Sequence, residues 1–316
     1  MHKPKVSVIM AVRNSEESVK GTIDAIIKQT FKNWEFVIVE DGSDDNTGDV
    51  VDEYAKNDNR IRVFHNKKRM ERCFSRNKAI SKAKGEYIAI HDGDDMSLPD
   101  RLTKEVKYLD ENPSCYLVSA RAYLEDENGR KIGESWGMGK NGDISGELEV
   151  RNRVVHSSIM FRNTGEYKYR EKFLAHSEDY DLVLQMTADG KEVHMLDDFL
   201  VIYSTKKNLV YNDYLIRQTY FAELARYLYR KKKYGGKDVY DKVDFSNVEQ
   251  YVSEDVILDL KMKKAFFEKD FIEARNILKK IMKKDKKLLW ICFYIDTFFN
   301  GTLYKIARTL KRSILY

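Results

Sequence analysis

The chain of 316 residues is 42% hydrophobic and 34% charged, which is enough for one large core and a smaller appended module. Its 56 Lys and Arg residues nearly balance its 51 Asp and Glu residues, and the net charge of +5 does not indicate a nucleic-acid partner. Its three cysteines have neither metal-ligand spacing nor even pairing, and they predict a reducing compartment.

Apolar runs and amphipathic segments alternate in the first part of the chain. Strands are predicted at residues 6–12, 36–39, 61–64, 87–90 and 116–118. Helices are predicted after Asn14, whose spacing to Glu17 resembles a capping box, at residues 74–84, and after Pro99. Strands that alternate with helices predict an α/β fold with a doubly wound, mostly parallel sheet covered on both faces.

The later elements are more helical. Residues 120–150 are polar and rich in glycine, and they predict a hairpin. A compact apolar patch follows at residues 154–161, and a helix is predicted to begin near Glu178. Further helices are predicted at residues 213–233 and, as a pair, at residues 254–284.

No targeting or membrane-spanning segment is predicted. The chain runs from Met1 into an apolar pattern at Val6 without a charged and apolar leader. The longest apolar stretch, residues 288–295, is too short to span a bilayer and is followed at once by Asp296. We therefore expect a cytoplasmic protein.

Two acidic clusters directly follow predicted strands. Glu40 and Asp41 come after one strand, and residues 92–95 come after another. Because ligands of α/β sheets bind beyond the carboxyl ends of the strands, both clusters should lie on one rim. In the second cluster Gly93 permits a tight turn. The aspartate carboxylates of this cluster suit Mn²⁺ or Mg²⁺. An acidic surface turn that caps a helix is the alternative.

Seven short motifs follow one another along the chain: Val6 to Met10, Glu40 to Asp45, Arg76-Asn77, Lys84 to Ala89, Asp92 to Asp95, Pro99 to Leu102 and Glu178 to Leu182. Their order is typical of family 2 glycosyltransferases, and the chain resembles that family over about residues 4–205. The resemblance implies a GT-A fold for a catalytic domain at residues 1–205. It also implies inverting sugar transfer from a nucleotide-sugar donor, most commonly UDP-linked, by a hexosyl- or N-acetylhexosaminyltransferase.

The same resemblance implies roles for individual residues. Asp94, with Asp92, would bind the metal ion. Asp41 would accept a hydrogen bond from the base of the donor, although Asp41 and Ser43 also suit the start of the next helix. The implied donor-binding residues are Val12, Asn14, Asp41, Arg76, Asp92 and Gly93.

Asp179 is the predicted catalytic base, with Glu178 beside it. Inverting transfer needs a group that removes the proton of the acceptor hydroxyl, and two adjacent carboxylates raise the pKa of one of them. The alternative is that both are ordinary first-turn acids favoured by the helix dipole. His156 resembles a family position near the acceptor or diphosphate, but a core histidine fits the pattern equally well.

The loop before Arg76 departs from the family pattern. Where the family often has a glycine shortly after the position of Asn66, this chain has Lys67, Lys68 and Arg69. These cations, with Arg72, can meet donor phosphates or form a solvated charged face.

The α-helical region at residues 206–316 ends in a basic and aromatic composition from Lys279 onwards. Such a composition suits peripheral contact with the inner face of the cell membrane and a lipid-linked acceptor. A helical lid and a homodimer interface are the alternatives.

Competing enzyme classes lack their motifs. No Gly-x-Gly-x-x-Gly follows a strand and no Gly-Lys-Ser/Thr is present, which argues against a dehydrogenase and a P-loop kinase. The prediction is therefore a glycosyltransferase that acts on a glycan or lipid-linked acceptor in cell-surface polysaccharide or glycoconjugate synthesis. The alternative is a non-catalytic nucleotide-sugar-binding or scaffold protein with the same fold.

Overall fold

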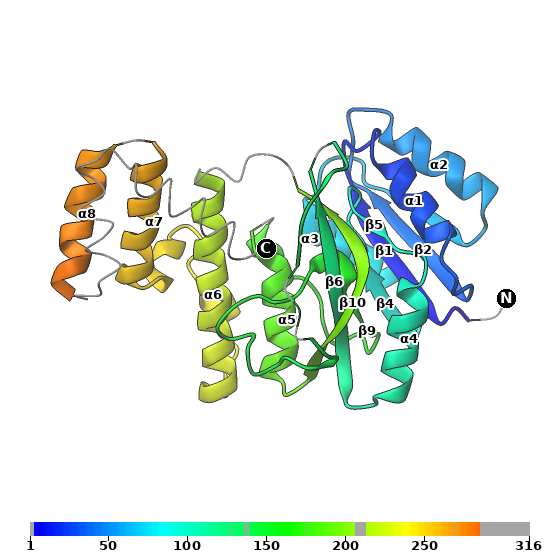
Figure 1. Cartoon of the computed structure of the whole chain (residues 1–316). Coiled ribbons are helices and arrows are strands. Elements are labelled where there is room, and N and C mark those ends of the chain that lie inside the picture. The colour runs from blue at the N-terminus through cyan, green and yellow to red at the C-terminus, as the bar shows by residue number, and fades with distance from the viewer. Residues whose placement is uncertain are drawn as a thin grey trace. The chain divides into compact units, whose positions relative to one another are not determined.

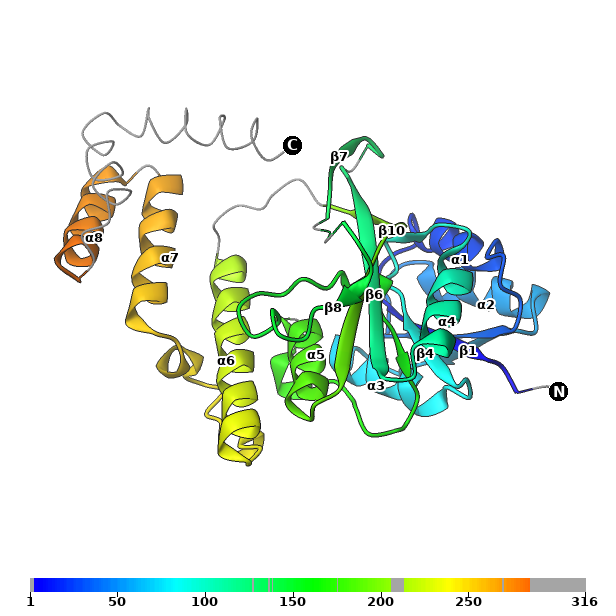
Figure 2. The same cartoon turned by 60° about the horizontal axis from the view of Figure 1, so that its bottom comes forward.

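A computed structural model describes residues 3–284, except residues 127, 136, 138, 175, 206–212 and 269 (Figures 1 and 2). The helices are α1 (Val19–Ile27), α2 (Thr47–Asn57), α3 (Arg72–Lys82), α4 (Arg101–Glu111), α5 (Glu178–Ala188), α6 (Asp213–Gly235), α7 (Glu254–Phe267) and α8 (Phe271–Lys284). The strands are β1 (Val6–Val12), β2 (Trp34–Glu40), β3 (Ile61–His65), β4 (Tyr87–Ile90), β5 (Met96–Ser97), β6 (Cys115–Glu125), β7 (Lys131–Glu134), β8 (Gly142–Asp143), β9 (Met160–Arg162) and β10 (Glu192–Ser204).

One sheet organises the first part of the chain, in the order β3-β2-β1-β4-β9-β6-β10-β5, with β7 on β6 and β8 on β10. Strands β3, β2, β1 and β4 are parallel, as are β6 and β10. Strand β9 runs antiparallel between β4 and β6, so the sheet is mixed beyond its parallel part. The predicted α/β class is confirmed, and β6 and β7 form the predicted hairpin.

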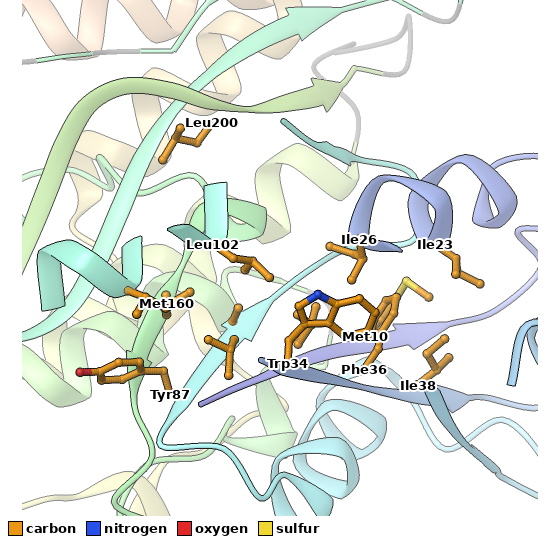
Figure 3. Close-up of a cluster of buried hydrophobic side chains, with 14 of the residues drawn as sticks. Met10, Ile23, Ile26, Trp34, Phe36, Ile38, Tyr87, Leu102, Met160 and Leu200 are labelled. Atoms are coloured by element: carbon orange, nitrogen blue, oxygen red, sulfur yellow. The ribbon is translucent and has the colours of Figure 1, made fainter. Parts of the chain in front are cut away.

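A hydrophobic core of buried side chains lies on one face of this sheet (Figure 3). Alternate residues of β1 and β2, such as Met10, Phe36 and Ile38, point into it because strand side chains alternate between faces. Helices α1, α2 and α4 supply the other side, with Ile23 and Leu102 among the fully buried residues. Helix α3 contacts β1 and β2 without joining this core, so it covers the opposite face.

One local expectation was wrong, and one strand was missed. The helix after β1 begins at Val19, and Asn14 does not cap it. Instead Asn14 has φ +49°, and its side-chain oxygen accepts a hydrogen bond from the amide of Asp44. Strand β10 was not predicted, because Asp197 and Asp198 interrupt its apolar pattern where the pairing with β6 shifts register.

The chain divides into two compact units. The first comprises the described residues up to 205 together with 225–242, and the second contains residues 213–224 and the described residues from 243 onwards. In the second unit α7 and α8 pack through Met262, Ala274, Leu278 and neighbouring apolar residues. The predicted boundary at residue 205 stays a prediction.

Within the described residues, no helix has the length and apolar character needed to cross a membrane. The residues from 285 onwards, which carry most of the basic and aromatic composition that suggests membrane contact, lie outside the described part of the chain.

Candidate active site

The predicted donor-side residues gather at the carboxyl ends of β1, β2 and β4. Val12 pairs with Glu40 in the sheet register, and the amide of Asp41 donates to the carbonyl of Val12 at 2.9 Å. The amide of His91, just after β4, donates to the carbonyl of Ile9 at 3.0 Å. The two acidic clusters therefore share one rim of the sheet, as predicted.

Asp41 is held rigidly in this rim. It is 5% exposed, and its Oδ1 accepts hydrogen bonds from Asn66 Nδ2 at 2.7 Å and from the Met70 amide at 2.8 Å. Ser75 on α3 accepts a second bond from the same Asn66 amide group at 2.8 Å. These bonds orient the carboxylate through Oδ1. Oδ2 is therefore the oxygen that can accept a hydrogen bond from an N–H group of a ligand.

Gly42 lets two loops of the rim approach closely. Its φ is +64°, and a Cβ atom at this position would lie 2.7 Å from backbone atoms of Lys68 and Arg69. Only glycine avoids both the left-handed strain and the clash. The loop after Asn66 can therefore pack against the segment that contains Asp41 because Gly42 has no side chain.

The acidic loop is anchored to α1 and β10. Thr22 Oγ1 donates to the carbonyls of Gly93 at 3.1 Å and Asp95 at 3.0 Å, and Ser18 Oγ also donates to the Gly93 carbonyl. The Asp95 side chain accepts bonds from Ser157 Oγ and from the Ser204 amide. Burial and the charge of Asp92 raise the pKa of Asp95 to about 8.

Arg76 joins the acidic loop to the start of α5. Its guanidinium donates to Glu178 Oε1 at 2.7 Å and to Asp92 Oδ1 at 2.5 Å. Asp92 Oδ2 lies 2.8 Å from His156 Nδ1, so both oxygens of Asp92 have partners. Burial would raise the pKa of Asp92, but Arg76 and His156 lower it well below its ordinary value. Each oxygen keeps a second lone pair, and the side chain is 23% exposed, so these partners hold Asp92 in place without excluding a further ligand.

Asp179 lies next to Glu178 in the first turn of α5. It is half-buried, and its Oδ2 lies 3.4 Å from Asn152 Nδ2. Burial and the charge of Glu178 raise the pKa of Asp179 above its ordinary value. A carboxylate whose pKa is raised in this way is a better proton acceptor than an ordinary surface aspartate.

Tyr203 at the end of β10 faces the same carboxylates. Burial, followed by the negative charges of Asp95, Asp92, Asp179 and Asp94, raises its pKa to about 12. The charges of the acidic loop and of Asp179 therefore contribute to the electrostatic environment of this hydroxyl. Tyr203 is 38% exposed and was not identified from the sequence.

Asp94 is the exposed carboxylate of the acidic loop. Among the described residues, no three His, Cys, Asp or Glu side chains are grouped around a metal position. Asp94 nevertheless fits a cation held by one carboxylate and completed by substrate phosphates and water, which is a common arrangement for Mg²⁺.

Sequence reasoning did not identify Tyr169. Its hydroxyl lies 2.9 Å from His156 Nε2, and its ring centroid lies 5.3 Å from the Arg76 guanidinium carbon. Asn77 exchanges two hydrogen bonds with the Tyr169 backbone, at 2.8 and 2.9 Å. The Arg76-Asn77 motif was the signal for this contact, but its partner lies 92 residues away.

Residues 7–167 match the profile described as glycosyl transferase family 2. The chain is 36% identical over 208 residues to an uncharacterized glycosyltransferase of Methanocaldococcus jannaschii, which covers 64% of this chain and 71% of that relative. Other curated relatives, from Bacillus subtilis, are matched over about half of their length.

Two solved structures have a similar fold. TarS 1–349 of S. aureus, in complex with UDP, gives a TM-score of 0.59 at 17% identity over 96% of this chain and 92% of that one. The mannosyltransferase PcManGT of Pyrobaculum calidifontis, in complex with GDP-Man and Mn²⁺, gives 0.57 at 17% identity over 98% and 83%. The fold is thus the GT-A type that the motifs implied. On the profile match and the curated relative, the chain belongs to glycosyl transferase family 2.

Proposed function

We propose that the chain is an inverting glycosyltransferase that moves a hexosyl or N-acetylhexosaminyl group from a UDP-sugar to a hydroxyl of a glycan or lipid-linked acceptor. The observation that carries the proposal is the pair of bonds from Arg76 to Asp92 and Glu178, which joins the predicted donor loop to the residue next to the predicted base. The UDP and GDP-Man complexes of proteins with this fold support a nucleotide-sugar donor.

In this proposal Asp41 Oδ2 accepts a hydrogen bond from the base of the donor, while Val12, Asn14 and Gly93 contact the same donor. Asp94 would hold Mn²⁺ or Mg²⁺, and the positive charge of such an ion would supply stabilisation of the departing diphosphate. These assignments are consistent with the fixed orientation of Asp41 and with the exposure of Asp94.

Asp179 accepts the proton of the acceptor hydroxyl as its oxygen attacks the anomeric carbon. The bond between that carbon and the donor phosphate oxygen breaks, and the nucleoside diphosphate leaves with the electron pair. Attack opposite the leaving group inverts the anomeric configuration. The raised pKa of Asp179 supports this role.

The test measures nucleoside diphosphate release from UDP-, GDP- and dTDP-sugars, with and without Mn²⁺, in the presence of cell-derived acceptor extract. We expect metal-dependent release from one donor, lowered about 100- to 10,000-fold by Asp179→Asn and also lost in Asp94→Ala. Asp189→Asn, beyond the other end of α5, is the matched control and should retain activity. Donor binding without turnover, unchanged by Asp179→Asn, would favour a non-catalytic nucleotide-sugar-binding protein.

A further inference from the structure

Arg76 was expected to contact the donor, but its surroundings point to another role. Only 3% of its side chain is exposed, and its two terminal nitrogens already bind Glu178 and Asp92. An arginine that serves donor phosphates needs those same nitrogens to be open to the cleft. In this structure the two terminal nitrogens of the guanidinium bind two carboxylates of the protein itself.

These two carboxylates come from distant parts of the chain. Asp92 follows β4, 16 residues after Arg76, whereas Glu178 opens α5, 102 residues after Arg76. Carboxylates with little access to water need a counter-charge, and Arg76 supplies one to Glu178, which is 6% exposed, and to Asp92, which is 23% exposed. Because the guanidinium is planar and rigid, the two bonds also fix the spacing between the acidic loop and the first turn of α5.

Tyr169 and its hydrogen-bond partners support the face of the Arg76 guanidinium. The Tyr169 ring lies under the guanidinium, and the hydroxyl of this ring contacts His156, which in turn contacts Asp92. Asn77, the next residue on α3, binds the Tyr169 backbone in both directions. Arg76 is thus held from below as well as from both ends.

We propose that Arg76 is a positioning residue for sugar transfer, which sets Glu178 and the adjacent Asp179 at a fixed distance and orientation from the donor-side loop. This inference rests on the proposed function, since it assigns Asp179 the proton transfer. Arg76 touches neither the donor nor the acceptor in this role. It acts through Glu178 on one side and through Asp92 on the other.

The experiment compares donor affinity with turnover in Arg76→Lys. Lysine keeps the charge, but its single ammonium group lacks the fork that spans both carboxylates. A displacement of about 1 Å in a reacting group costs on the order of 100-fold in rate, so we expect that loss in kcat. The Kd of the donor nucleotide, measured by calorimetry in the presence of Mn²⁺, should stay close to the wild-type value.

Two further variants guard against simple misfolding. Arg101→Lys alters another buried arginine that binds a carboxylate, Glu105, but touches neither Asp92 nor Glu178. It should lower the melting temperature without lowering kcat of the folded enzyme. Arg76→Met combined with Glu178→Gln removes both members of one ion pair, so it should regain part of the stability that Arg76→Met loses while kcat stays low.

Three results would overturn the inference. A weakened donor Kd with an unchanged kcat in Arg76→Lys would make Arg76 a donor-binding residue. If Arg76→Lys and Arg101→Lys lost kcat in the same proportion to their loss of unfolding free energy, the role of Arg76 would be purely structural. Full kcat in Arg76→Lys would remove the role altogether. The proposed function fails separately, if the wild-type chain releases no nucleoside diphosphate or Asp179→Asn retains full activity.

Discussion

Among the described residues, two buried arginines, Arg101 and Arg76, each bind carboxylates but in different surroundings. In the interior, Arg101 binds Glu105, Ser97 and the carbonyls of Ile90 and Ile159, and both members of its ion pair are 0% exposed. At the rim of the sheet, Arg76 binds Glu178 and Asp92, and the Asp92 side chain remains 23% exposed.

The difference lies in what the carboxylates can reach. Glu105 reaches only the interior of the protein, where Arg101 also bridges the carbonyls of Ile90, the last residue of β4, and Ile159, the residue before β9. Asp92 and Glu178 instead adjoin the exposed Asp94 and the half-buried Asp179. The interior cluster should therefore govern stability, whereas changes at the rim should affect binding or turnover. The following predictions test this division.

The largest expected effect on stability is that of Arg101→Met. It leaves the Glu105 carboxylate buried without a counter-charge, which costs about 3–5 kcal/mol in the free energy of unfolding. Urea unfolding measures this loss, and kcat of the folded fraction should be unchanged. Lys107→Met on the exposed face of α4 is the control. A loss of kcat at temperatures where the variant is fully folded would contradict the claim that the Arg101 cluster governs stability alone.

Gly42→Ala should affect both properties, because Gly42 supports the rim without being part of the site. The left-handed φ costs about 1–3 kcal/mol for a residue with a side chain. The new Cβ also displaces the loop at Lys68 and Arg69, so donor binding should weaken.

The control for this change is Gly48→Ala in α2, where a Cβ atom meets only ordinary contacts. Alanine stabilises a helix interior by about 0.5–1 kcal/mol relative to glycine, and Gly48, the second residue of α2, should gain part of this amount. Thermal melting of the two variants should therefore shift in opposite directions. A shift in the same direction would contradict the close approach at Gly42.

Asp41→Asn should weaken donor binding with little change in stability. Asparagine keeps one oxygen for Asn66 and the Met70 amide, but an NH₂ group replaces the oxygen proposed to read the base. We expect the donor Kd to rise about tenfold, close to 1.4 kcal/mol. Calorimetry measures the Kd, and Asp49→Asn on the exposed side of α2 is the control. An unchanged Kd would remove Asp41 from the donor site.

The smallest effect concerns His65 at the end of β3. Burial would lower its pKa, but ion pairs with Asp52 and Glu40 raise it above its ordinary value. The pairs therefore contribute fully below about pH 6.5, and their contribution is lost as the pH rises through the folded-state pKa.

Because the His65 side chain is 44% exposed, this contribution is less than about 1 kcal/mol. His65→Gln should reduce the difference in unfolding free energy between about pH 6 and about pH 9. Donor affinity at either pH should not change. An identical pH dependence in the variant would show that other groups are responsible.

The parallel half of the fold could be predicted from the sequence because its signals are local. Each of β1, β2 and β4 is an apolar run that ends at a polar cluster, and this pattern places Asp41 and Asp92 on one rim. Strand β10 was missed because its register shifts accommodate Asp197 and Asp198, which break the apolar alternation. The capping prediction at Asn14 failed because a left-handed backbone directs this residue to Asp44 instead.

The site was predictable as a set of motifs, but its connections were not. Motif order indicated Asp92 and Glu178 separately, whereas the Arg76 bonds that join them depend on how α3 and α5 pack. Tyr169 and Tyr203 carried no signal, since single tyrosines fit a core or a surface equally well. Long-range hydrogen bonds have no periodicity, and a single sequence does not reveal them.

The contacts that anchor the acidic loop determine how this part of the native protein unfolds locally. Bonds from Thr22 and from the Ser204 amide hold the loop to α1 and to the end of β10. The loop therefore opens only when these contacts break, so it should behave as one cooperative unit with them. In native-state hydrogen exchange, the amides of Asp95 and Ser204 should share one opening free energy.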